Sequence, residues 1–79
     1  MNYRILYFAS LRDAAGYDSE TLAIDSTSAR EVYAQLRQRH GFSFEPERLR
    51  VAVNGEFTTW DRTLNDADEI AFLPPVSGG

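Results

Sequence analysis

One segment limits the fold of this chain more than any other: a single, well-delimited helix between stretches that have the pattern of β-strands. Ser28 and Glu31 have the spacing of a capping box, and apolar residues then follow helical periodicity at positions 29, 32, 33 and 36. Gly41 suits a left-handed helix end. Cations that favour a helix C-terminus precede it at Arg37, Arg39 and His40. The sequence therefore predicts a helix over residues 29–40.

Turn residues divide the rest of the chain into short strands. Residues 3–8 alternate in polarity, so Tyr3, Ile5 and Tyr7 should share one face. The same reasoning predicts strands over residues 20–24, 49–53, 56–59 and 69–73. Asn54-Gly55 predicts a hairpin between the strands over residues 49–53 and 56–59.

The remaining segments are expected to be irregular. Residues 11–18 are expected to form a loop or short turn, and residues 61–68 a polar turn around Leu64. Residues 42–47 are expected to be a connection, because Pro46 opposes continuation of a helix.

The predicted order β-β-α-β-β-β indicates an α+β protein, with a mixed five-stranded sheet packed on one main helix. This is the element order of the β-grasp, or ubiquitin-like, fold. We expect a single domain over residues 1–79, with a tail over residues 74–79. In the last strand, Ile70 and Phe72 should face the core. Leu73, on the opposite face, should join Leu6 and Phe8 in an exposed apolar surface near the tail.

Composition excludes several kinds of site. Cysteine is absent, so the chain has neither a disulfide nor a thiolate metal site or cysteine nucleophile. Lysine is also absent, so no ε-amine is available for building chains of the protein on itself. A net charge of −4 without a basic stripe argues against nucleic-acid binding and suggests partners with basic docking surfaces. The sequence has no long apolar run and no evident secretory signal, so we expect no membrane association and a cytoplasmic location.

The most informative functional feature is the pair of glycines at the end of the sequence. Gly78 and Gly79 follow a predicted strand and the diproline Pro74-Pro75. Two glycines form a flexible thread without side chains, and the prolines limit flexibility just before it. Residues 73–79 carry no charged side chain, so insertion into another protein's active site desolvates only the terminal group. We therefore expect the tail, including Val76 and Ser77, to enter a partner, where the carboxylate of Gly79 is activated as an acyl-adenylate.

Other polar residues give weaker signals. The cluster of Asp66, Asp68 and Glu69 is interpreted as a solvated turn rather than a metal site, and no metal is expected. His40 is interpreted as a helix-end residue rather than a catalytic one. Ser10 and Ser77 have no histidine or lysine base nearby in the sequence, and Trp60 is expected to be partly in the core. Arg12 could form either a salt bridge or a docking contact.

The chain resembles the small subunit of molybdopterin synthase, a sulfur carrier of the ubiquitin-like superfamily. Three stretches carry this resemblance: residues 7–13 (YFASLRD) with Gly16, residues 52–54 (AVN), and Leu64 followed by residues 66–79 (DADEIAFLPPVSGG). The diproline ending is fairly specific within that superfamily, whereas Gly-Gly is shared with thiamine sulfur carriers and protein modifiers.

The resemblance implies a cycle of sulfur transfer. An adenylating enzyme activates Gly79 with Mg-ATP, and a sulfur donor such as a cysteine desulfurase relay converts it to a thiocarboxylate. The tail then enters the large synthase subunit, and two transfers to cyclic pyranopterin monophosphate build the molybdopterin dithiolene. The chain would be an enzyme only as the small subunit of this sulfurtransferase, a heterotetramer of two small and two large subunits, and it would bind no cofactor itself. Phe8, Arg12, Phe57 and Leu73 match the family's partner-contacting surface.

One residue departs from the family's pattern, and three other functions remain open. The family commonly has glycine where Ala67 stands, and alanine at a positive φ there costs about 1 kcal/mol. The alternative functions are a sulfur carrier for another pathway, such as thiamine or cysteine synthesis, a ubiquitin-like protein modifier, and a purely structural binding module.

Overall fold

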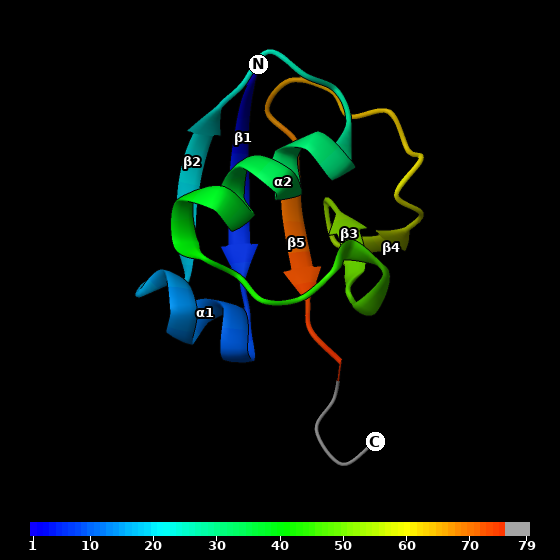
Figure 1. Cartoon of the computed structure of the whole chain (residues 1–79). Helices are drawn as coiled ribbons and strands as arrows, with labels where there is room; N and C mark the ends of the chain where they lie inside the picture. Colours follow the sequence, from blue (N-terminus) through cyan, green and yellow to red (C-terminus); the bar gives the residue numbers. More distant parts are fainter. Residues whose placement is uncertain (76–79) are drawn as a thin grey trace.

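A computed structural model describes residues 1–75 of the protein, and its strands form one mixed sheet in the order β2-β1-β5-β3-β4. The strands are β1 (Asn2–Tyr7), β2 (Ser19–Ala23), β3 (Arg50–Val53), β4 (Glu56–Thr58) and β5 (Glu69–Leu73). The long helix α2 (Ala29–His40) crosses one face of the sheet, and the short helix α1 (Ala9–Ala15) lies beyond the end of β1 (Figure 1). A 3-10 helix, η1 (Pro46–Arg48), precedes β3.

The central pair of strands joins the two ends of the described chain. β1 and β5 pair in parallel, with Ile5 opposite Ile70 and Tyr7 opposite Phe72. The other pairs, β1–β2, β3–β5 and β3–β4, are antiparallel. Because β1 and β5 run in the same direction, they leave the sheet at the same end, where α1 also begins (Figure 1).

The core lies between α2 and one face of the sheet, as the alternation predicts. Its fully buried members include Tyr3, Ile5 and Tyr7 from β1, Ile70 and Phe72 from β5, and Val32, Tyr33 and Leu36 from α2. Buried tyrosine hydroxyls need partners: Tyr3 donates to the Ser26 carbonyl at 2.6 Å and Tyr33 to the Phe44 carbonyl at 2.7 Å. Trp60 is partly buried, as predicted, and stacks on Phe72 with 5.6 Å between ring centroids.

Helix α2 has the predicted limits, but its capping box is only half formed. The Ser28 hydroxyl accepts a hydrogen bond from the backbone N–H of Glu31 at 3.3 Å. The backbone N–H of Ser28 donates to the Ser26 hydroxyl at 3.1 Å, so Ser26 fills the role that a capping box gives to the glutamate side chain. Gly41 ends the helix in the left-handed conformation, with φ 73°.

One prediction of irregular structure was wrong. Most of the segment expected to be a loop belongs to α1, which Gly16 ends at φ 89°. Helical periodicity could not reveal α1 because Leu11 is its one buried residue, and its N-cap, Phe8, makes no side-chain cap bond. The expected connection is confirmed, since α2 ends at His40 and does not continue through Pro46. Pro46 instead begins the separate η1, because a fixed φ suits the first position of a helix.

Two turns at the other end of the sheet are tied together by Asp68. This residue is 7% exposed, so the prediction of a solvated turn was wrong for it. Its carboxylate accepts bonds from Asn54 Nδ2 at 2.9 Å and from the Asn65 N–H at 2.8 Å. The predicted hairpin at Asn54-Gly55 is confirmed, with φ values of 52° and 85°. Ala67 has φ 71°, so the strain predicted at this position is present.

Within the part of the chain that the structure describes, no helix is long and apolar enough to cross a membrane.

Candidate docking surface

The face of the sheet opposite α2 carries a continuous cross-strand row of apolar side chains. Leu6 pairs with Ala71, Ala71 with Ala52, and Ala52 with Phe57. Since residues directly opposite one another in a sheet point to the same face, this row runs across β1, β5, β3 and β4. Ala71 and Ala52 are small, so a shallow groove lies between the larger side chains of Leu6 and Phe57 at the two ends of this row.

The groove reaches the end of the sheet where β1 and β5 finish. Phe8 and Leu73 line it together with the cross-strand row, Gly55 and Glu69. Phe8 is 44% exposed, because Ala9 turns the chain sharply into α1 with a φ of 50°. The predicted apolar surface of Leu6, Phe8 and Leu73 is therefore present, and Phe57 extends it. We call these four residues, with Ala52 and Ala71, the docking surface.

The tail begins at the edge of this surface. Leu73 ends β5, Pro74 is half-buried and Pro75 is exposed. The predicted insertion residues Val76, Ser77, Gly78 and the activated Gly79 lie outside the described residues. The docking surface thus adjoins the segment that leads to them.

Charged side chains border the docking surface. Arg4 and Glu69, paired in register between β1 and β5, form an exposed ion pair at 3.6 Å. The Arg50 guanidinium lies over the ring of Phe57, with its carbon 4.3 Å from the ring centroid. Arg50 escaped the sequence analysis, although the two-residue hairpin fixes the register that puts positions 50, 52 and 57 on one face.

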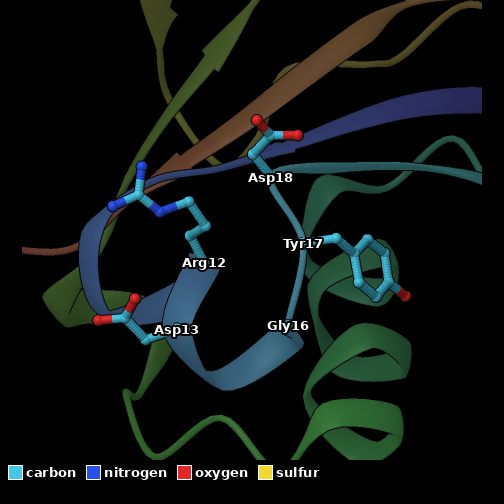
Figure 2. A pocket seen from close by; sticks show the side chains of 5 residues that line it. All are labelled: Arg12, Asp13, Gly16, Tyr17 and Asp18. Atoms are coloured by element: carbon cyan, nitrogen blue, oxygen red, sulfur yellow. The ribbon is translucent and has the colours of Figure 1, made fainter.

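Arg12 lies beside the docking surface, on α1. It lines an open pocket with Asp13, Gly16, Tyr17 and Asp18, and the Tyr17 ring extends toward α2 (Figure 2). Arg12 and Asp18 also line the adjoining groove beside Leu6 and Phe8. Among residues 1–75 Arg12 forms no ion pair, so the salt bridge is not observed there and the docking contact stays a prediction.

A second polar cluster, on the α2 side of the sheet, centres on Glu20. Its side chain is 9% exposed and accepts hydrogen bonds from the Tyr7 hydroxyl and from Arg39 Nη1 at 2.9 Å. His40 Nε2 lies 2.6 Å from Glu20 Oε2 and 3.5 Å from the Tyr17 hydroxyl. His40 is therefore a buried partner of Glu20, which its position at the helix end did not reveal.

The titration of this cluster follows from its hydrogen bonds. Burial alone would raise the pKa of Glu20, but the bonds from Tyr7 and His40 outweigh it and lower the pKa below the usual value. Burial raises the pKa of Tyr7 well above the usual range, and the bond to Glu20 raises it further. The carboxylate is thus kept charged as a bridge between β1, β2 and α2, which is a structural role.

The described residues offer little for catalysis by this chain alone. No group of three or more acidic or histidine side chains within residues 1–75 is arranged to hold a metal ion. Ser10 is exposed on α1, and His40 pairs with Glu20.

Comparison with known proteins identifies the family. A model described as the ThiS family matches residues 5–79. The chain belongs to the ThiS family. Similar relatives include the "Molybdopterin synthase sulfur carrier subunit" of Escherichia coli (strain K12), 35% identical over 79 residues that span 96% of this chain and 98% of the relative. The human protein of the same name is 31% identical over 80 residues, covering 95% of this chain and 91% of the relative. The resemblance to sulfur carrier subunits is therefore confirmed.

Solved structures confirm the β-grasp fold for this ThiS-family chain. SAMP1 from Haloferax volcanii has a TM-score of 0.83 at 26% identity, with full coverage of both chains. A putative molybdopterin converting factor subunit 1 from Pyrococcus furiosus has a TM-score of 0.78 at 27% identity, covering 96% of this chain and 99% of the other. A chain from a complex of subunits 1 and 2 of the molybdopterin-converting factor of Helicobacter pylori shares the fold, with a TM-score of 0.70 at 22% identity and full coverage of both chains.

Proposed function

We propose that this protein is the sulfur carrier subunit of a molybdopterin synthase and that it delivers sulfur on the carboxyl group of Gly79. The observation that carries the proposal is the position of the docking surface, at the end of the sheet where β5 leads into the tail. The curated relatives, aligned over nearly their whole length, carry this role in their names.

The chemistry begins with activation by a partner. A carboxylate is a poor electrophile, so an adenylating enzyme uses Mg-ATP to form an acyl-adenylate at Gly79 and releases pyrophosphate. A persulfide on a donor such as a cysteine desulfurase relay then displaces AMP and forms an acyl disulfide. A thiol of the donor system cleaves its S–S bond, which releases the thiocarboxylate and leaves the donor as a disulfide. In the large subunit, the sulfur bonds to a carbon of cyclic pyranopterin monophosphate to form a thioester with Gly79. Water then hydrolyses the acyl–sulfur bond, so the sulfur stays on the substrate and Gly79 returns to a carboxylate. Two such transfers complete the dithiolene.

We assign binding and reaction to different parts of the proposed complex. The carrier binds the large subunit through Phe8, Arg12, Phe57 and Leu73, and the tail over residues 74–79 enters the partner's active site. An apolar groove with two exposed aromatic rings suits a specific protein interface. The reaction pocket belongs to the large subunit, in an assembly of two small and two large chains.

The test is deletion of Gly79 in a reconstituted system that holds the large subunit, the adenylating enzyme, Mg-ATP and a sulfur donor. We expect complete loss of molybdopterin formation, while Arg48→Gln, at an exposed position of η1 that does not line the groove, remains active. In the unaltered chain, mass spectrometry of the C-terminal peptide should show one oxygen replaced by sulfur. Unchanged product formation by the deletion variant contradicts the proposal.

A ubiquitin-like modifier is the second candidate, because solved small archaeal modifier proteins share the fold at 26% and 27% identity. It predicts higher-mass conjugates in native cells that require Gly79. Immunoblotting of wild-type and Gly79-deleted cells distinguishes the two functions, since a carrier alone forms no such conjugates.

A further inference from the structure

We propose that Arg50 is a recognition and positioning residue of the docking surface: it fixes the exposed ring of Phe57 and binds a carboxylate on the partner. This inference rests on the proposed function, in which a larger subunit docks on that surface. It adds a residue to the interface and specifies the chemistry of the partner at one point.

Phe57 needs a support of this kind. It is 58% exposed, more than the other large apolar side chains that lie on the described surface. It lies on β4, a three-residue edge strand whose one neighbour in the sheet is β3. The Arg50 guanidinium, 4.3 Å from the ring centroid, covers one face of the ring. A cation over an aromatic face is attracted to it, so Arg50 restrains a ring that the core does not hold.

A second arginine in the molecule shows what is unusual about Arg50. Arg30 lies 5.6 Å from the ring centroid of Trp60, and it also pairs with Glu47 at 3.2 Å. Arg50 has the closer ring but forms no ion pair with a carboxylate of residues 1–75. Stacking uses the flat face of a guanidinium and leaves the N–H groups at its edge available. Arg50 therefore retains donors for an acceptor from outside the chain.

The position of Arg50 determines where that acceptor must lie. Arg50 is directly opposite Leu73 in the β3–β5 register, so its charge is at the border of the docking surface beside the start of the tail. A partner that covers Phe57 and Leu73 excludes water from this border. A charge-assisted hydrogen bond is strongest in such surroundings. The matching group on the partner is an Asp or Glu side chain next to apolar residues, which differs from the basic surface suggested by the net charge of −4.

The experiment measures the affinity of the carrier for the large subunit encoded in the same genome, at several salt concentrations. Loss of a charged hydrogen bond and of ring support in Arg50→Gln should weaken binding on the order of tenfold and make its salt dependence shallower. Arg50→Lys keeps the charge but not the planar face, so it should recover part of the affinity. Arg48→Gln removes an equal charge from the neighbouring 3-10 helix, where no aromatic ring is stacked, and should bind like the wild type.

Two further measurements separate recognition from a general structural effect. The Tm of Arg50→Gln should match that of the wild type, because the side chains of Arg50 and Phe57 are both exposed. In a Phe57→Leu background, Arg50→Gln should cost less affinity than in the wild type, since part of its effect passes through the ring. If Arg50→Gln binds the large subunit as tightly as the wild type does, the inference about Arg50 is overturned and the proposed function is not. Failure of the wild type to bind the large subunit overturns the proposed function and the inference together.

Discussion

The two faces of the sheet are built from the same strands, but one is covered by α2 and the other is open. In β5, Ile70 and Phe72 point into the core and are fully buried, whereas Leu73, on the other face, remains half-exposed. In β1, the same alternation separates buried Tyr7 from the partly exposed Leu6 next to it. The closed face holds the fold together, and the open face keeps apolar area uncovered. Apolar side chains alone therefore do not indicate stability, because their face determines whether they stabilise this chain or a complex.

The largest expected contrast compares a phenylalanine on each face. Phe72→Ala should lower the free energy of unfolding by about 3–5 kcal/mol, because it leaves a cavity beneath Tyr33 and Trp60. Phe57→Ala should change it by less than about 1 kcal/mol, since the ring is mostly in solvent. Chemical denaturation measures both. Equal losses in the two variants would remove the distinction between the faces.

The Glu20 cluster adds a polar contribution to the closed face. Glu20→Gln should cost about 2 kcal/mol at neutral pH, because the amide cannot accept all the hydrogen bonds that the buried carboxylate receives. The pKa of Glu20 is lowered in the folded state, so its contribution is present above the unfolded pKa and is lost as pH falls through the lower folded value. The difference between the variant and the wild type should therefore shrink below about pH 4.5.

Denaturation at pH 7 and at lower pH tests this contribution. Glu45→Gln is the matched control, because Glu45 also pairs with an arginine, Arg37, but on the surface. Loss of the Glu45 charge should change the free energy of unfolding little. A penalty for Glu20→Gln that grows as the pH falls would show that the carboxylate is not the stabilising form.

The smallest expected effect lies in the turn that leads into β5. Ala67 has φ 71°, a conformation that glycine adopts without steric cost. Ala67→Gly should raise the free energy of unfolding by up to about 1 kcal/mol and raise Tm by several degrees. The same change at Ala34, exposed within α2, should lower stability by about 1 kcal/mol. A destabilised Ala67→Gly variant would mean that the alanine is not strained.

Most of the fold could be predicted because its local signals agree with its tertiary contacts. The capped helix, the Asn54-Gly55 hairpin and the alternation in β1 and β5 each carry enough information in a few residues. α1 could not be predicted in this way, since a seven-residue helix with one buried side chain has almost no periodic signal. The Glu20 cluster was missed for another reason, because it joins residues from β1, β2 and α2 that only the folded chain brings together.

The candidate site was predictable in part. Phe8 and Leu73 follow from strand alternation, and their proximity follows once β1 and β5 are paired in parallel. The overlap of Arg50 with Phe57 depends on side-chain conformation on top of register, which no sequence pattern encodes. The net charge was a poor guide to this face, since Arg4, Arg12 and Arg50 gather around it in an acidic chain.

The parallel pairing of β1 with β5 also has a consequence for synthesis of the protein. Arg4 pairs with Glu69, so a ribosome must deliver almost the whole described chain before the central strands of the sheet can meet. Loop closure over such a separation is slow compared with local folding. A nascent or truncated chain that lacks β5 has neither Leu73 nor the groove beside it. A partner that binds through this surface would therefore bind only chains in which β5 has joined the sheet.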